Sequence, residues 1–456
     1  MGPRQAHSAG PGGAPRAGRP PPFPQPRHPA ARQRSGAAPG ASVTSPSVPR
    51  SSITRLWTAS ALSSGSTWVM QISLFIQVLR DSSPATLAAV ELIGTVPALA
   101  FMMVAGTLAD RFDVRRLAIG SMVAQAVCVL GMVLFLDNGI WITAAFYGLQ
   151  GLSNTLWPPA RQQWLYGVVP PAGRPTANAR LGSVSGTMTV VGASLGGVLS
   201  SWSPTGAMAV AGALQVLAVV PLLLQAKVPL AYAEPVPEGA HAEPLRKELT
   251  AGVRVLRDLP LARSVVWIGI AWGCIGGAYD VLLAAYATGY LAGSGTVLGA
   301  LYVMDGVAVI LGTVLAARIA LRHHLSAYAA AYIFQGLAWG SFFLVGHPVV
   351  AIALLGLMRA ASGIIIALDT TVLLATVPAS VRGRVTSVHM TTYSAMARIS
   401  LALFAGLLIV SDVRTVGLCT GVASVVLGAI WWWRRDREAE RLYPAAVAEE
   451  REPASA

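Results

Sequence analysis

Long apolar stretches joined by short polar connections dominate this chain. A bilayer-spanning helix needs about 20 mostly apolar residues, and roughly twelve stretches meet that requirement. They lie at about 55–79, 86–109, 117–137, 140–158, 181–203, 205–225, 264–288, 296–317, 325–345, 348–371, 385–410 and 413–433. Because lipid offers no partner for free backbone groups, each stretch is expected to be helical. With 54% hydrophobic and 12% charged residues, a soluble helical bundle is disfavoured. We predict an all-α integral membrane protein with twelve transmembrane helices.

The net charge of +13 does not indicate nucleic-acid binding, because the basic residues gather on one side of the predicted membrane. All but four of the 33 Lys and Arg residues fall on that side. Arg80 and Arg414 lie on the other side, and Arg359 and Arg398 lie within spans. By the positive-inside rule the basic side is cytoplasmic, as are both termini. We expect a multi-pass protein of the inner or plasma membrane, in contact with anionic lipid headgroups.

The chain is expected to divide near its middle. A Pro/Glu/Ala-rich segment and a charged amphipathic helix at 245–257 separate six spans from six. The N-terminal residues are rich in Pro, Gly, Ala and Arg without an apolar core, so they are no secretory signal; a wrongly assigned start is the other interpretation. The predicted parts are a disordered cytoplasmic tail at 1–52, a six-helix bundle at 53–225, a cytoplasmic loop at 226–263, a six-helix bundle at 264–433 and a cytoplasmic tail at 434–456.

The two halves share a short pattern at corresponding places. Residues 169–174 and 377–382 both read V-P-x-x-x-R, and each leads into a small-residue span. This indicates a duplicated six-plus-six architecture. Chance similarity in membrane sequence of low diversity is the alternative.

Sites for metals, cofactors or enzymatic chemistry are not indicated. Cys128, Cys274 and Cys419 lie in apolar spans without metal-ligand spacing, so we interpret them as core residues. The two lysines, Lys227 and Lys247, do not belong to a phosphate-binding loop. Metalloprotease and serine-hydrolase motifs are absent from the sequence. The chain is therefore not predicted to be an enzyme, and the membrane half of an ABC exporter stays formally open.

The connection between the second and third spans is the most distinctive motif. Gly106 lets another helix approach closely, because it lacks a Cβ atom. Asp110 stands one turn further on, where a carboxylate can meet the N-terminus of a neighbouring helix. Arg111, Arg115 and Arg116 then hold the short loop in the cytoplasm.

This segment resembles the signature loop of major facilitator superfamily transporters, G-x-L-A-D-R-x-G-R-R-R-L. Asp113 stands where Gly is usual, and Val114 where a basic residue is usual. The resemblance implies two six-helix bundles around a central cavity that opens alternately to each side. It also implies that Gly106 and Asp110 meet the eleventh helix in the outward-open state. Asp113 and the nearby arginines would add charge pairs; simple anchoring of the loop is the alternative.

Other segments look most similar to the drug- and siderophore-exporter branch, which includes macrolide and enterobactin exporters. The matching residues are 159–161 (PAR), 169–170 (VP), 177–179 (ANA) and 382–385 (RGRV). The resemblance spans residues of about 52–435 and does not identify the cargo.

The fifth span contains a second branch motif. Gly192, Gly196 and Gly197 form G-A-S-L-G-G, which resembles the G-P-x-L-G-G signature of proton-driven exporters with Ala193 in place of Pro. Ordinary packing of small residues explains the stretch equally well.

Charged residues inside spans are costly and are candidates for proton coupling. Six qualify: Glu91, Asp280, Asp305, Arg359, Asp369 and Arg398. A proton-coupled transporter needs a carboxylate that is neutral in one state and charged in another. Asp305 and Asp280 are the leading candidates, with Arg359 as a partner. Structural ion pairing is the alternative for each residue.

Span 4 contains Tyr147 and Gln150 in Y-G-L-Q-G, which matches the family's R-x-x-Q-G signature except that Tyr replaces Arg. Arg359 stands at the comparable place in the other half. Trp68, Trp272 and Tyr279 lie on the first and seventh spans, which line the cavity in this superfamily. An amphipathic cargo could stack there; core packing is the alternative.

We therefore predict a monomeric secondary transporter that exports a small amphipathic or apolar compound, a drug, siderophore or natural product, in exchange for protons. Uptake of a metabolite is the nearest alternative. A receptor or lipid-handling protein on the same fold is a third.

Overall fold

The computed structural model describes residues 50–136, 139–170, 173–230, 254–257, 259–291, 295–377 and 381–434, together with Gly2, Tyr232 and Tyr443. Val48–Ala456 form one compact unit, and every described helix belongs to it. The predicted N-terminal tail and most of the predicted amphipathic helix and C-terminal tail lie outside the described residues.

Every regular element in the described part of the chain is helical. The thirteen α-helices are α1 (Arg50–Asp81), α2 (Pro84–Arg111), α3 (Val114–Phe135), α4 (Ile140–Val168), α5 (Arg174–Trp202), α6 (Pro204–Gln225), α8 (Pro260–Gly276), α9 (Tyr279–Tyr290), α10 (Gly295–Ala316), α11 (His324–Phe342), α12 (Pro348–Thr376), α13 (Arg382–Val410) and α14 (Val413–Arg434). One 3₁₀ turn, η2 (Leu321–His323), precedes α11.

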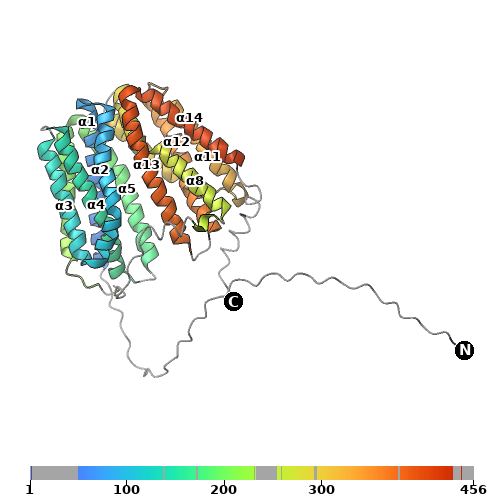
Figure 1. Ribbon diagram of the computed structural model, residues 1–456. Helices are drawn as coiled ribbons and strands as arrows, with labels where there is room; N and C mark the ends of the chain where they lie inside the picture. Colours follow the sequence, from blue (N-terminus) through green and yellow to red (C-terminus); the bar gives the residue numbers. More distant parts are fainter. Residues whose placement is uncertain are drawn as a thin grey trace. The chain divides into compact units, whose positions relative to one another are not determined.

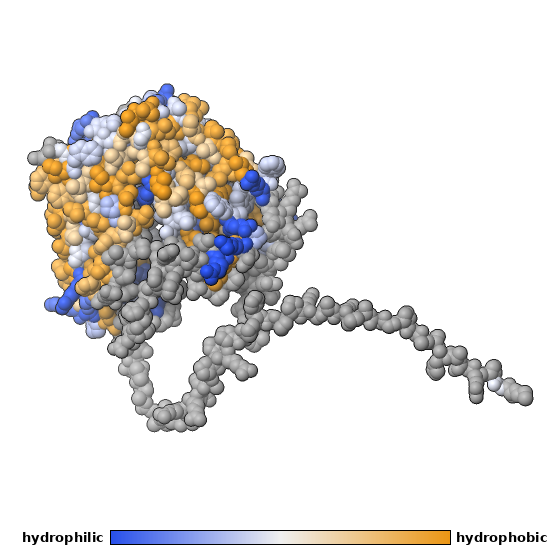
Figure 2. All heavy atoms as spheres, in the orientation of Figure 1, coloured by the Kyte–Doolittle hydropathy of each residue, from blue (hydrophilic) through white to orange (hydrophobic). Residues whose placement is uncertain are grey.

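The helices make twelve rods, as expected, because α8 and α9 follow one another within a single apolar stretch, Pro260–Tyr290. Within the described ranges, nine stretches are long and apolar enough to cross a membrane. Large apolar side chains also cover the outside of the helices (Figure 2). A surface of this kind suits lipid and not water. The all-α membrane fold predicted from the sequence is confirmed.

Local sequence explains where the helices begin. Ser83 and Ser203 accept hydrogen bonds from backbone N–H groups in the first turns of α2 and α6, and a proline follows each of them. Serine at the N-cap with proline at the first helical position is a strong start signal. The connections between neighbouring rods are therefore short and fixed.

The helices pack in two groups. In the N-terminal half, α1 packs against α5 and α6, and α4 packs against α2 and α3. In the C-terminal half, α12 packs against α10 and α11, α11 against α14, and α8 against α13. The main contacts between the halves are α5 with α10 and α2 with α13. Figure 1 shows α13 crossing beside α2.

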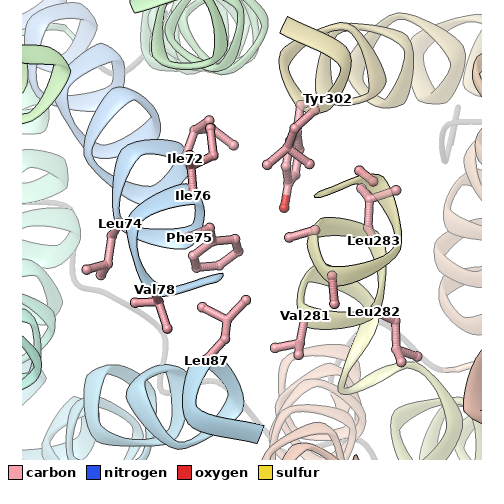
Figure 3. Packing of buried hydrophobic residues seen from close by; sticks show 14 of the residues in the cluster. Ile72, Leu74, Phe75, Ile76, Val78, Leu87, Val281, Leu282, Leu283 and Tyr302 are labelled. Carbon is pink, nitrogen blue, oxygen red and sulfur yellow. The ribbon is translucent and has the colours of Figure 1, made fainter. Parts of the chain in front are cut away.

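The apolar core differs between the two ends of the rods. Where α1 ends and α2 begins, one cluster of buried residues draws on both halves. Figure 3 shows part of it, with Phe75 and Ile76 of α1 on one side and Leu283 and Tyr302 on the other. We name this the sealed end.

At the opposite end, where α1 begins and α14 ends, the buried residues form two separate clusters. One contains only N-terminal-half residues, such as Leu56 and Trp164. The other is built on the C-terminal half, with Leu261 and Tyr328 among its members. Among the described residues the halves therefore share a core at one end only, and we name the other the split end.

Candidate functional site

Each of the four carboxylates in the middle of the described spans accepts a hydrogen bond from a tyrosine hydroxyl. The pairs are Tyr147–Glu91, Tyr302–Asp280, Tyr279–Asp305 and Tyr328–Asp369. A phenol satisfies a carboxylate without adding charge. What else surrounds each carboxylate distinguishes the four sites.

Asp305 of α10 is the most constrained. The Tyr279 hydroxyl donates to its Oδ2 at 2.9 Å, and Arg359 of α12 donates from Nε to its Oδ1. The Arg359 guanidinium also lies 5.1 Å from the centroid of the Tyr279 ring. The three residues join α9, α10 and α12 through a charge-balanced cluster. The structure thus brings together the two residues that the sequence suggested as partners.

Asp280 of α9 has no cation within ion-pair distance in the described part of the chain. The Tyr302 hydroxyl donates to its Oδ1 at 3.1 Å. The Tyr302 ring packs in turn on Trp68 of α1, with ring centroids 5.8 Å apart. Asp280 is therefore connected through one tyrosine to the opposite half of the molecule.

Glu91 of α2 is the matching group in the N-terminal half. The Tyr147 hydroxyl donates to its Oε1 at 2.8 Å, and both side chains are buried. Tyr147 thus uses its hydroxyl where the family motif has an arginine, so this pair has no positive charge of its own. Gln150, one turn further along α4, is also buried.

Arg398 of α13 is half-buried on the wall of the same region. It lines a cavity together with Asp280 and Arg359, and it is close enough to interact electrostatically with Glu91 and Asp280. Arg398 is thus a positive charge that both carboxylates without an ion-pair partner have nearby, and Asp280 has Arg359 nearby as well.

Asp369 of α12 lies apart from these groups, nearer the split end. The Tyr328 hydroxyl donates to its Oδ1 at 2.6 Å, and His389 Nε2 of α13 lies 2.8 Å from its Oδ2. His389 is not among the residues predicted from the sequence, because only formally charged side chains within spans were considered there. A histidine inside an apolar stretch is the signal that could have found it.

Two cavities open between these side chains. One of about 290 Å³ is lined by Asp280, Arg359 and Arg398 among others. The other, of about 320 Å³, is lined by Asp369 and His389 among others. Trp272, Arg359 and Tyr393 line both. All lining residues belong to the C-terminal half, and Trp272 and Tyr279 are among them while Trp68 is not.

The signature loop is described in part. Gly106, Asp110 and Arg111 lie in α2, where the structure describes the backbone but not these side chains. Asp113 caps α3, since its Oδ1 accepts from the backbone N–H groups of Arg115 and Arg116 at 3.0 Å. A carboxylate is a favourable N-cap residue, and this explains why Asp can stand at position 113, where the family signature has Gly.

The two arginines of the loop's second half differ. Arg115 donates from Nη2 to the carbonyl oxygen of Val228 at 2.7 Å, and so ties the loop to the segment after α6. Arg116 has an exposed side chain.

The glycines of α5 bring three helices together. A Cβ atom on Gly192 would lie 2.9 Å from the carbonyl oxygen of Gly65, and one on Gly196 would lie 3.0 Å from Val69 Cα, both on α1. A Cβ atom on Gly197 would lie 2.5 Å from Gly299 Cα on α10. Gly192 and Gly196 therefore pack inside the N-terminal half, whereas Gly197 closes the contact between the halves.

Comparisons with known proteins agree with this architecture. The model of the family described as Major Facilitator Superfamily matches residues 56–399. A sequence comparison with curated proteins finds no match.

Similar solved structures include the nucleoside transporter NupG, with a TM-score of 0.64 and 13% identity over 84% of this chain and 100% of that one. A bacterial homolog of the human lysosomal transporter Spinster, inward-facing and unoccupied, has a TM-score of 0.64 and 14% identity over 87% and 99%. A bacterial homologue of the iron transporter ferroportin, also inward-facing, has a TM-score of 0.61 and 15% identity over 83% and 98%. At such low identity these likenesses show the fold alone.

Proposed function

The chain belongs to the Major Facilitator Superfamily, and we propose that it exports a small amphipathic or apolar compound, such as a drug, siderophore or natural product, in exchange for protons. Membership in this family indicates a membrane transporter and not a catalytic enzyme. The observation that best supports the finer proposal is the pair of intramembrane carboxylates, Glu91 and Asp280. Both lie close to the seam between two halves whose described residues share a core at one end only.

The asymmetry of the two ends supports alternating access. In the present state apolar packing joins the halves at the sealed end, whereas the described buried residues form separate clusters at the split end. If the six-helix bundles 53–225 and 264–433 rock against each other, breaking the seal would have to be matched by closing the split end. The two cavities then face one side at a time.

The direction of the present opening follows from charge. The split end is where α1 begins and where the short α2–α3 loop presents Arg115 and Arg116. The positive-inside rule makes this end cytoplasmic, with both termini on the same side of a plasma membrane. The present state is then inward-facing and ready to load cargo from the cytoplasm, as a single transporting chain.

The carboxylates support proton coupling through their different partners. Asp305 is neutralised by Arg359, so its charge is balanced in the present state. Asp280 and Glu91 have only tyrosine hydroxyls within bonding distance in the described part of the chain. A charged carboxylate buried without an ion-pair partner is costly, and binding a proton removes that cost. Opening the sealed end would hydrate both groups and let the proton exchange with the outer solution.

The nature of the cargo follows from the cavity walls and the branch resemblance. In the 320 Å³ cavity Trp272, Tyr332 and Tyr393 provide aromatic surface, and Arg359 and Asp369 provide the charged contacts. Mostly apolar cavities with a few polar groups suit amphipathic small molecules. This is also the cargo type that resemblance to the drug- and siderophore-exporter branch implies.

The test is accumulation of dyes and antibiotics in energised inverted membrane vesicles, with and without a protonophore. We expect accumulation that the protonophore abolishes, and that Asp280→Asn reduces at least tenfold at equal protein level. Asp412→Asn is the matched control, because Asp412 also accepts a tyrosine hydrogen bond but lies in the loop before α14. Movement in the opposite direction would favour metabolite uptake. Saturable binding without flux would favour a receptor or lipid-handling protein.

A further inference from the structure

The cluster of Asp369, Tyr328 and His389 has a feature that the proton and cargo roles above do not use. His389 is 4% exposed, and its Nε2 lies 2.8 Å from Asp369 Oδ2. Its Nδ1 is buried and has no hydrogen-bond partner in the described part of the chain. A buried ring nitrogen without a partner is uncommon, and it leaves one position on the imidazole free to gain or lose a proton.

The charge of this cluster depends on that position. A neutral imidazole that donates Nε2–H to Asp369 leaves Nδ1 bare, and the pair then has a net charge of minus one. A proton on Nδ1 makes an imidazolium beside the carboxylate, and the net charge becomes zero. The pair therefore changes charge by one unit without breaking its hydrogen bond.

Helix α8 leaves room for the ring but offers it no acceptor. A Cβ atom on Gly269 would lie 2.5 Å from His389 Cε1 and 3.1 Å from its Nδ1. Because glycine occupies the position, α8 fits closely against the imidazole. An Nδ1–H group would point at this surface without an acceptor among the described residues.

The titratable groups around the pair come from each packed helix. Helix α11 presents Tyr328 and Tyr332, with Tyr328 bonded to Asp369. Helix α12 presents Arg359, whose charge Asp305 balances. From α8 come Gly269 and Trp272, which do not titrate.

The remaining neighbours add no second anion among the described residues. Helix α14 places Trp431 on the Tyr328 ring, with centroids 5.1 Å apart. On α13 itself Tyr393 follows one turn later. The described part of α2 contributes one charge in mid-span, Glu91, and this carboxylate interacts with Arg398. Arg398 lies roughly 13 Å from His389 along α13, at a rise of 1.5 Å per residue. Asp369 is thus the one carboxylate among the described residues lining the 320 Å³ cavity.

This cavity has the composition of a site for an organic cation. Trp272, Tyr332 and Tyr393 provide aromatic faces, which attract positive charge. Asp369 provides the negative charge, and its two known hydrogen bonds leave about two of four lone-pair positions free. The volume suits a small ligand at the lower end of ordinary binding cavities.

We propose that Asp369 and His389 form an exchange site that holds either one monovalent aromatic cation or one proton. The cation binds while His389 is neutral, because the pair is then negative. When water delivers a proton to Nδ1, the pair becomes neutral and the cation loses its counter-charge; when a cation binds, the proton returns to water. The inference rests on the proposed export function and names its cargo class.

The test uses the purified full-length chain in detergent and tetraphenylphosphonium, a cation whose charge does not change with pH. Its affinity is measured from about pH 8 to about pH 5.5, the range in which imidazole titrates. We expect affinity to fall toward about tenfold per pH unit once the imidazole is mostly protonated. At the acidic end, a weakly buffered solution containing a pH indicator should report about one proton released per cation bound.

Variants separate the two roles. Asp369→Asn should weaken binding at least tenfold at the alkaline end, because the counter-charge is lost. His389→Gln keeps an N–H donor for Asp369, so binding there should stay within about threefold while the pH dependence disappears. The matched control is His324→Gln: His324 is also buried, but it bonds Tyr443 and the Ile319 carbonyl and lies outside both cavities. It should keep the wild-type pH profile.

Unchanged pH dependence in His389→Gln, or undiminished binding in Asp369→Asn, would overturn the proposal. If a variant fails to fold, proton release by the wild-type chain decides alone, since an exchange site must release protons and a plain cation site does not. Gradient-driven efflux together with pH-independent cation binding would support the proposed export function and contradict the proposed exchange site. Exchange of cation and proton in detergent, without gradient-driven efflux in vesicles, would support the exchange site and contradict the export function.

Discussion

The two halves of this transporter share a helix arrangement but differ in chemistry. In the middle of its described spans the N-terminal half presents one carboxylate, Glu91, bonded to Tyr147. The C-terminal half presents three carboxylates, two arginines and a histidine: Asp280, Asp305, Asp369, Arg359, Arg398 and His389. Both cavities are lined by residues of the C-terminal half.

This difference suggests a division of labour. The C-terminal half would hold the groups that bind cargo and protons. The N-terminal half would act as the apolar wall that closes over them, with Gly192 and Gly196 fitting α5 tightly to α1. Substitutions in the two halves should therefore have unequal effects. Two pairs of variants compare the halves directly, one tests the ion pair of the C-terminal half and one tests the seam, in order of decreasing expected effect.

Arg359→Gln should have the largest effect. It leaves the Asp305 carboxylate without its cation in a mostly buried position, and breaking a buried pair on one side costs about 3–5 kcal/mol. We expect a lower melting temperature in detergent and a loss of transport. The double variant Arg359→Gln with Asp305→Asn should regain most of the stability. A double variant no more stable than the single one would contradict the ion-pair assignment.

Asp280→Asn and Glu91→Gln compare the matching carboxylates of the two halves. Both keep the shape and the hydrogen bond to tyrosine but cannot exchange a proton. Proton-coupled efflux should fall at least tenfold in Asp280→Asn and about threefold in Glu91→Gln, while facilitated movement down a cargo gradient should survive in both. The measurement is vesicle transport with and without a pH gradient. Equal losses would place coupling in both halves.

Gly197→Ala tests the seam where the halves meet. The added methyl group would lie 2.5 Å from Gly299 Cα and 2.7 Å from the Gly295 carbonyl oxygen, both backbone atoms. Overpacking of this kind costs about 1–3 kcal/mol. It would destabilise only the state in which the sealed end is closed, because the two helices are in contact only in that state. A cysteine introduced by Ile76→Cys should then react about tenfold faster with a maleimide.

The control for this prediction is Gly186→Ala on the same helix, since no described atom of a neighbouring helix lies within 4 Å of the added methyl group. It should leave the labelling rate unchanged. Equal rates in Gly197→Ala and the unsubstituted background would mean that the sealed end does not open at this contact.

Trp272→Leu and Trp68→Leu compare aromatic residues of the two halves and should have the smallest effects. Trp272 lines both cavities, whereas Trp68 packs on Tyr302. Losing an aromatic face for a bound cation weakens binding by about 1 kcal/mol, so the apparent affinity should fall about fivefold in Trp272→Leu. In Trp68→Leu it should change less than twofold. A larger change in Trp68→Leu would extend the binding surface into the N-terminal half.

The fold could be predicted from the sequence because its main determinant is local. Each apolar stretch specifies a span by its own length and composition, and Ser83, Ser203 and Asp113 specify helix starts within a few residues. The break between α8 and α9 is less visible. There a Cβ atom on Gly277 would overlap the Ala397 carbonyl oxygen of α13, so the need for glycine at this position becomes visible only from the packing of another helix.

The candidate site could be predicted as a list of residues but not as a set of pairs. Charge within an apolar span points to Asp280, Asp305 and Arg359 individually, whereas their tyrosine partners look like ordinary aromatic residues. Tyr302 and His389 acquire their roles only through helix packing. The roles proposed for Gly106 and Asp110 stay predictions, since their side chains lie outside the described part of the chain.

The central claim, proton exchange against cargo, is tested most directly in liposomes that contain the purified chain and an internal pH-sensitive dye. A gradient of tetraphenylphosphonium is imposed at equal pH on both sides and with the membrane potential clamped. We predict that protons move opposite to the cation, and that Asp280→Asn and Asp369→Asn stop this movement. Cation flux without proton movement, or proton movement in the same direction as the cation, would contradict the claim.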